Sequence, residues 1–234
     1  MASCCSAQTS VKSDDDDWKL MKENERYSIY ARKLTKSKFK EIKVIGRIQS
    51  SLSAIVMALE DIEYQKEWVL RTLDAYEIEQ LGVGKYHFYL STDMPFPVSD
   101  RDLVCYYERT QDPETKVVTT ISYATPELIP EEESLVRIPS FDSYYILTPD
   151  DDGWLDMEYF LKIDPGGALP AWVVNLAATT GPNSTMRALY KVIASGKYDD
   201  IVVKGIVEHK SPHIRRHIEF LLLSYPSYLK SASQ

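Results

Sequence analysis

The chain has 234 residues, 44% of them hydrophobic and 26% charged, a composition typical of one large globular domain. Its 27 basic and 35 acidic residues give a net charge of −8, which argues against a nucleic-acid binder because such proteins present a basic face. No apolar run is long enough to span a membrane, and three cysteines do not make a disulfide framework. We therefore expect a soluble, cytoplasmic protein.

The first segment, residues 1–17, is polar and ends in four consecutive aspartates, which predicts a disordered leader. It contains no apolar core of a signal peptide. An alternative is that Cys4 or Cys5 became the lipid-anchored first residue of an exported protein after a signal was removed from a longer precursor. A precursor with an apolar segment directly upstream would decide between the two.

Short elements are predicted between residues 18 and 70. Alternation of apolar and polar residues indicates strands, whereas a serine before an apolar run indicates the start of a helix. The predicted elements are a helix over Trp18–Glu25, strands over Arg26–Lys33 and Phe39–Gln49, a helix over Leu52–Glu60 capped by Ser50 or Ser51, and a helix over Ile62–Leu70.

A meander of strands follows, because hairpin signals recur at short and regular spacing. Apolar and polar residues alternate most regularly in the last strand, which predicts one solvent-exposed and one buried face, as is typical of an antiparallel sheet. The predicted strands are Thr72–Gln80, Lys85–Thr92, Arg101–Thr110, Lys116–Ala124, Glu133–Pro139, Asp142–Thr148 and Trp154–Ile163.

A long helix is predicted after the turn Asp164-Pro165-Gly166-Gly167, since apolar residues then recur with helical spacing. Gly181-Pro182 separates two apolar stripes and predicts a bend. A long antiparallel sheet buries its inner face most simply by curling around one such helix, and a curled sheet can enclose a cavity. The sequence therefore predicts an α+β fold.

Two stretches carry a resemblance to a known family. Met94–Val104 reads Met-Pro-Phe-Pro-Val-Ser-Asp-Arg-Asp-Leu-Val, and Asp164–Asn175 reads Asp-Pro-Gly-Gly-Ala-Leu-Pro-Ala-Trp-Val-Val-Asn. Together with Trp68 and with Arg137 in Val-Arg-Ile-Pro, they resemble the START domain, a lipid-transfer family related to the steroidogenic acute regulatory protein. The resemblance covers residues 18–196.

The resemblance implies a helix-grip fold, in which a curved antiparallel sheet of about nine strands wraps a long C-terminal helix. It also implies a hydrophobic tunnel for one lipid, often a sterol, phospholipid or sphingolipid. The motif residues Arg101, Asp102, Arg137, Pro165 and Gly166 are interpreted as structural, through a stiff loop and a local ion-pair cluster.

The family's gate is the long helix plus a loop between the middle strands, which here would be Thr125–Glu133. Leu128 and Ile129 at its tip could form a lid that touches a membrane transiently, or could fold back onto the core. Some sterol-binding members place an acid and an arginine inside the tunnel. The corresponding positions fall on Phe88 and Tyr107, which are uncharged. The charged pair that anchors a sterol in those members is therefore absent from these positions, and the ligand class stays open.

Strand alternation and helical phase give a set of side chains expected to face the tunnel, although a slip of one residue inverts a strand. Hydroxyl tips and one thiol among them would set ligand specificity. The predicted ligand-binding residues are Phe88, Leu103, Cys105, Tyr107, Tyr123, Met157, Tyr159, Leu161, Trp172, Val173 and Leu176.

Three functions are compatible with these features. The first is non-enzymatic binding, with transfer or sensing, of one lipid or other hydrophobic molecule, which needs no catalytic group, cofactor or metal. The second is an enzyme of the polyketide cyclase type, with Tyr107, Tyr159 and His87 as candidates, although no inward carboxylate lies beside a base. The third is a regulatory module with a collapsed tunnel.

The final segment, residues 197–234, lies beyond the resemblance and is predicted to add a helix. Its apolar residues could dock on the domain or on a second copy, and the oligomeric state stays open. His209, His213 and His217 are spaced four apart, but no acid or cysteine at close spacing completes a metal site. We interpret them as a solvated helix face.

Overall fold

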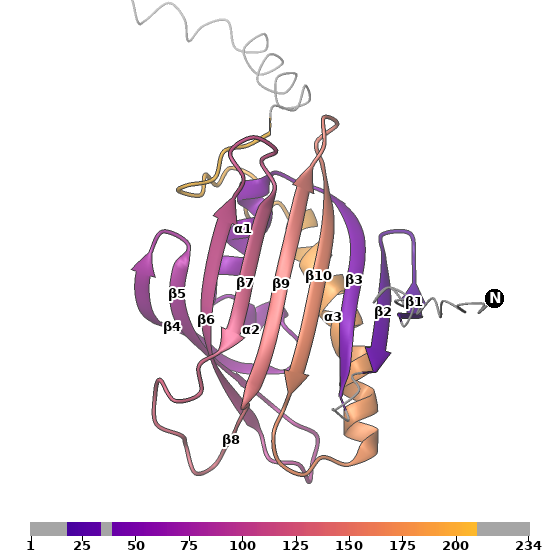
Figure 1. The fold of residues 1–234 in the computed structure, drawn as a ribbon, viewed down its shortest axis with the longest axis vertical. Helices are drawn as coiled ribbons and strands as arrows, with labels where there is room; N and C mark the ends of the chain where they lie inside the picture. Colours follow the sequence, from indigo (N-terminus) through magenta and orange to yellow (C-terminus); the bar gives the residue numbers. More distant parts are fainter. Residues whose placement is uncertain (1–17, 34–38, 210–234) are drawn as a thin grey trace, which may run out of the picture.

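The structure, a computed structural model, describes residues 18–33 and 39–209, apart from the side chains of residues 171, 172 and 174–179. Within this part of the chain, ten strands form one sheet, and three helices lie on the same side of it (Figure 1). The sheet is antiparallel except for one short parallel pair. The predicted α+β helix-grip architecture is confirmed.

The strands follow each other mostly as hairpins. Their bounds are β1 Lys19–Glu23, β2 Tyr27–Lys33, β3 Lys40–Gln49, β4 Thr72–Gly82, β5 Lys85–Thr92, β6 Arg101–Gln111, β7 Val118–Ala124, β8 Val136–Arg137, β9 Ser140–Pro149 and β10 Trp154–Asp164. Their order in space is β1-β2-β3-β10-β9-β7-β6-β5-β4, with β8 pairing β6 off this path. The pairing of β3 with β10 joins the first part of the chain to the last strand and completes the sheet.

Three predicted elements are wrong. Residues 19–23 form the edge strand β1 and not a helix, because they pair with β2 along one side while all five side chains stay exposed. The second short helix is limited to α2, Gln65–Trp68. The predicted strand Glu133–Pro139 shrinks to the two residues of β8, which pair in parallel with the start of β6.

Helix α1, Leu52–Glu60, begins as predicted at Ser51, whose hydroxyl accepts a hydrogen bond from the Ala54 amide at 3.1 Å. Helix α3, Ala171–Ala194, is the predicted long helix and runs through Gly181 and Pro182. Buried side chains from both helices, among them Leu52, Ile55, Met186 and Leu189, pack on the inner face of the sheet.

The close approach of α3 to the sheet depends on Gly46 in β3. A Cβ atom at this position would lie 2.7 Å from the Tyr190 hydroxyl and 2.9 Å from the Tyr27 Cβ atom. The Tyr190 hydroxyl instead lies 3.1 Å from the Arg26 carbonyl oxygen, to which it donates a hydrogen bond. The glycine therefore leaves the space in which the helix is fixed to the strands.

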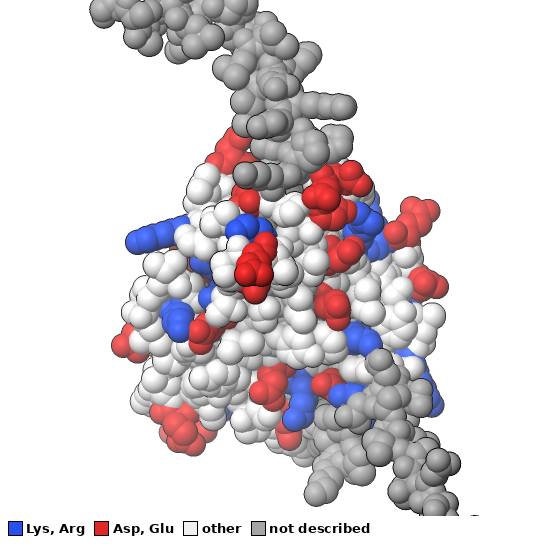
Figure 2. Space-filling view, turned by 45° about the horizontal axis from the view of Figure 1, so that its top comes forward, with Lys and Arg blue, Asp and Glu red and all other residues white. Residues whose placement is uncertain are grey.

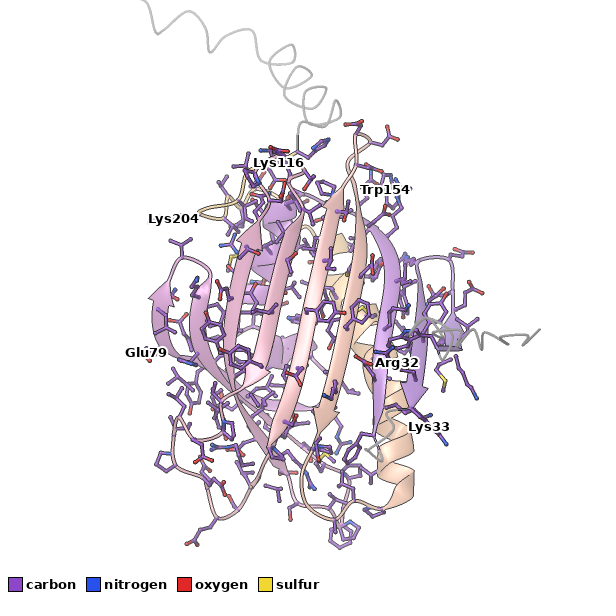
Figure 3. All side chains as sticks on the ribbon, viewed as in Figure 1. Arg32, Lys33, Glu79, Lys116, Trp154 and Lys204 are labelled. Carbon is purple, nitrogen blue, oxygen red and sulfur yellow. The ribbon has the colours of Figure 1, made fainter. Side chains whose placement is uncertain are left out.

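Of the last segment, for which a helix is predicted, residues 210–234 lie outside the described residues, and the described part, residues 197–209, consists of turns and irregular chain. It crosses the end of the molecule marked by Lys116 and Lys204 in Figure 3 and bonds to α1 and β6. Figure 2 turns this end forward and shows lysine and arginine side chains scattered among acidic ones, without a continuous basic surface on the face drawn.

Candidate functional site

A cavity of about 600 Å³ lies between the inner face of the sheet and the helices. Its wall is mostly aliphatic and aromatic, because the inward positions of the strands carry such residues. The main wall residues are Phe88 and Leu90 of β5, Leu103 and Tyr107 of β6, Phe141 and Tyr145 of β9, Tyr159, Leu161 and Ile163 of β10, and Leu59, Trp68 and Val173 from the helices and their ends. A concave space with such a wall suits an apolar ligand.

Six predicted residues line this cavity, namely Phe88, Leu103, Tyr107, Tyr159, Leu161 and Val173. Cys105 and Met157 are fully buried, as their strand phase predicts, but they pack in the core and do not reach the cavity wall. Burial also raises the pKa of the Cys105 thiol, so the thiol stays protonated and unreactive. Trp172 and Leu176 lie outside the described side chains.

The inward orientation predicted for Tyr123 is wrong. Its side chain is 43% exposed on the outer face, where its ring lies 5.0 Å from that of Tyr106. The neighbouring residues Thr120 and Ser122 of β7 line the cavity instead. The error is the one-residue slip to which strand phase is vulnerable when a strand has no strong apolar alternation.

The sequence analysis missed Thr120, Ser122, Ser143 and Tyr145, four cavity residues that carry hydroxyl groups. Tyr144 and Tyr145 are adjacent in β9, so their residue types could not show which ring faces inward. The pairing of Tyr145 with Tyr159 is the signal that decides it, since opposite residues of an antiparallel pair share a face.

Behind Tyr107 lies a buried polar cluster. The Tyr107 hydroxyl donates to Glu60 Oε1 at 3.1 Å, and Arg109 Nε donates to the same oxygen at 2.8 Å. Burial raises the pKa of the Glu60 carboxyl, against the opposing effect of the Arg109 charge. Through its bond to Glu60, the hydroxyl of Tyr107 holds α1 against β6. Glu60 and Arg109 themselves do not line the cavity.

Leu70, Arg71 and Asp93 line the cavity and are also partly exposed at the surface, from which we infer that the cavity opens beside them. Arg71 and Asp93 form an ion pair there. Met94 and Pro95 also line the cavity, and the next residue, Phe96, is 94% exposed. A large aromatic side chain therefore projects into solvent next to the opening.

The predicted gate residues Leu128 and Ile129 do not line the cavity, and Leu128 is 40% exposed. Their loop is held by Arg137, which donates to the carbonyl oxygens of Ile129 and Pro130 at 3.1 Å each. Arg137 also forms a two-pronged ion pair with Asp102 at 2.9 and 3.0 Å. The gating role of Leu128 and Ile129 stays a prediction.

The other motif residues meet at the start of α3. The Arg101 guanidinium donates to the carbonyl oxygens of Pro165 and Gly166 at 3.4 and 3.3 Å. Gly166 has a φ of +69°, and a Cβ atom there would lie 3.2 Å from the Arg137 carbonyl oxygen. The two motifs of the sequence thus join the first residues of β6 to the loop that leads into α3.

Among residues 18–33 and 39–209, no group of three or more histidine, cysteine or acidic side chains could hold a metal ion. His209 pairs with Asp151 at 2.8 Å, whereas His213 and His217 lie outside the described residues. None of the described helices is long and apolar enough to serve as a membrane span.

The family model described as "START domain" matches residues 3–189, which is most of the chain. The chain belongs to the START domain family. The resemblance predicted from the two motifs is therefore confirmed, together with the fold that it implies.

Known relatives agree with this membership. An uncharacterized protein from Pseudomonas aeruginosa is 27% identical over 174 residues, which cover 74% of this chain and 85% of the relative. The human phosphatidylcholine transfer protein is 28% identical over 173 residues, which cover 71% of this chain and 79% of the relative. A crystallised fragment of the STAR-related lipid transfer protein from Xanthomonas axonopodis has a TM-score of 0.70 and 26% identity, covering 76% of this chain and 99% of the fragment.

Proposed function

We propose that this START domain binds one hydrophobic ligand, a lipid or sterol, in its cavity and carries or senses it without chemical conversion. The observation that carries the proposal is the apolar space of about 600 Å³ that opens to the surface beside Arg71 and Asp93. Burial of apolar ligand surface, about 25 cal/mol per Å², supplies the driving force. Membership of a lipid-transfer family supports the same function.

The alternatives receive less support from the site. A collapsed tunnel does not fit the open space between sheet and helices. Acid–base catalysis needs a proton-transfer group within reach of the ligand, but Glu60 lies behind Tyr107 and the hydroxyl of Tyr107 is already bonded to it. His87 belongs to the outer face, where its ring lies 5.5 Å from that of Tyr106.

We further propose that the opening contacts a membrane transiently during ligand exchange. The exposed Phe96 adjoins two residues of the cavity wall, and Leu70 and Leu128 are also partly exposed. An exposed aromatic side chain favours the boundary between water and lipid headgroups. The proposed contact lies at the loop Asp93–Pro97, in addition to the loop that the family resemblance suggested.

Native mass spectrometry of the purified chain tests the binding function. The expected result is a bound species whose added mass is recovered as a lipid after extraction, and whose structure is unchanged after incubation with the protein. A chain that is purified empty and then takes up no member of a broad lipid panel would contradict the proposal. Conversion of the bound molecule would favour the enzyme instead.

A further inference from the structure

Five hydroxyl-bearing side chains lie together on the inner face of the sheet. Strand register places Thr120 opposite Tyr145 and Tyr145 opposite Tyr159, which forms one row across β7, β9 and β10. The neighbouring row places Ser122 opposite Ser143. All five residues line the cavity. The apolar wall is thus interrupted at the middle of the sheet by one continuous polar patch.

The two tyrosines of this hydroxyl patch are the informative members. Their rings stack at 4.3 Å with an angle of 20° between their planes, and Tyr159 is only 8% exposed. Within the described residues neither hydroxyl has a hydrogen-bond partner, in contrast to the hydroxyl of Tyr107. Burial raises the pKa of both groups, so both remain protonated and can donate. A buried hydroxyl without a partner loses stability unless a ligand or water supplies one.

Charge is confined to the opening. Among the described residues of the cavity wall, only Arg71 and Asp93 are charged, and they pair with each other at the surface. Residues 171–186 of α3 contain no charged residue in their sequence. A charged group beside the hydroxyl patch would therefore be buried without a counter-ion, which is strongly unfavourable.

Size restricts the ligand further. A cavity of about 150 Å³ holds one benzene molecule with its six carbon atoms, so a cavity of about 600 Å³ holds about 24 non-hydrogen atoms. A phospholipid with two long acyl chains has about 50 such atoms and would need about twice this space. One alkyl chain or one fused-ring skeleton is the size that matches.

We infer that the ligand is an uncharged lipid with a single hydrophobic unit, whose hydroxyl or carbonyl group bonds to Tyr145 and Tyr159. The inference rests on the proposed function and names the ligand class of the same cavity. It separates this chain from relatives named for phosphatidylcholine transfer, since that lipid has two chains and a charged headgroup. A long-chain alcohol, a monoacylglycerol and a sterol share the required chemistry.

The first test compares two pairs of ligands. A long-chain alcohol and a fatty acid of equal length differ in charge, and a monoacylglycerol and phosphatidylcholine differ in chain number and headgroup. Binding is measured with the full chain at neutral pH by displacement of a fluorescent lipid. The alcohol and the monoacylglycerol are expected to bind at least about tenfold more tightly than their counterparts. A sterol run in parallel distinguishes the chain from the ring skeleton.

The second test removes the two hydroxyls by Tyr145→Phe and Tyr159→Phe together. Affinity for the alcohol should fall about 5- to 30-fold, while affinity for an alkane of the same length should not change. Tyr144→Phe is the matched control, because this ring stacks on Phe160 at 4.3 Å in an equivalent pair on the outer face. Should the double variant fold poorly, Thr120→Val and Ser143→Ala test the same patch with smaller changes.

The outcomes separate this inference from the proposed function. Tighter binding of the uncharged single-unit lipids, lost in the double variant and kept in the control, supports both. Equal or tighter binding of phosphatidylcholine or of the fatty acid overturns the inference but leaves a lipid carrier. Unchanged alcohol affinity in the double variant also overturns the inference. Absence of binding by every lipid overturns both.

Discussion

Asp102 and Arg137 show how single residues fix the loops around the opening. Their side chains are 1% and 3% exposed, and the pair also holds the carbonyl oxygens of the β7–β8 loop. A buried ion pair contributes little compared with a well-packed apolar pair, but removal of one partner leaves a buried charge without compensation. The pair thus makes the local arrangement of β6, β8 and this loop strongly dependent on both residues.

Asp102→Asn should therefore lower the free energy of unfolding by about 3–5 kcal/mol, because the Arg137 charge stays buried. Urea unfolding followed by circular dichroism measures the change. Lys85→Ala, which removes the partly exposed ion pair with Glu108, is the control and should leave stability close to that of the parent chain. Equal stability of the Asp102 variant and the parent would show that the pair is not buried in solution.

The buried tyrosines predict a pH dependence. The pKa values of Tyr107, Tyr145 and Tyr159 are raised above 10.0 by burial, so the folded chain keeps these protons after the unfolded chain has lost them. The contribution of these tyrosines to the stability of the folded chain is fully present below pH 10 and is lost as the pH rises through the pKa values of the folded chain. Urea midpoints measured from neutral pH to above pH 10 should fall in the alkaline range, and less steeply in the Tyr145→Phe, Tyr159→Phe variant.

At the scale of elements, α1 is capped from a distant part of the chain. The Glu208 carboxylate accepts hydrogen bonds from the amides of Leu52 at 2.9 Å and Ser53 at 2.7 Å. These are amides that a helix leaves without internal partners, and the N-terminal end of a helix dipole favours a negative charge. The segment after α3 is thereby fixed to the first helix.

Glu208→Ala should lower stability by about 1–2 kcal/mol, since two charge-assisted hydrogen bonds are lost at the start of α1. Hydrogen exchange should accelerate at the amides of Leu52 and Ser53 but not in β9. Glu208→Gln keeps one acceptor oxygen and should give an intermediate effect. Unchanged exchange at these two amides in the alanine variant would contradict the capping role.

The loop Asp93–Pro97 provides a second prediction at this scale. Phe96→Ala should slow ligand uptake from lipid vesicles severalfold, because the exposed ring no longer enters the headgroup region. Stability should stay within about 0.5 kcal/mol of the parent, as is usual for exposed residues. Vesicle uptake and urea unfolding measure the two effects. Val83→Ala, an exposed apolar residue in the β4–β5 turn, is the control.

The elements also show what the sequence could predict. Strands β3, β5, β6 and β10 and helices α1 and α3 are recovered to within a few residues because their apolar periodicity and turn residues agree. Edge strand β1 has no buried face, so its pattern carried no strand signal. The sequence does not show whether Tyr123 in β7 and Tyr145 in β9 face the cavity or the solvent, because only the pairing with neighbouring strands fixes the face.

At the scale of the whole molecule, the cavity between sheet and helices is the feature that the proposed function requires. Ser143→Phe places a ring into the cavity and should reduce the amount of bound ligand by at least about half, because the space is matched to one hydrophobic unit. Thr148→Phe, at an exposed position of the same strand, is the control and should bind normally. Native mass spectrometry measures occupancy. Full occupancy in the Ser143 variant would place the ligand elsewhere.

The sheet register also determines where the chain can be attached to a sensor surface. The opening adjoins Thr92, which pairs with Arg101 at the start of β6, whereas the β9–β10 turn that carries Asp151 lies at the opposite end of the strands. A chain immobilised through Asp151→Cys would point its entrance away from the support. Exchange with a facing bilayer could then be followed on a sensor surface without steric obstruction by the linker.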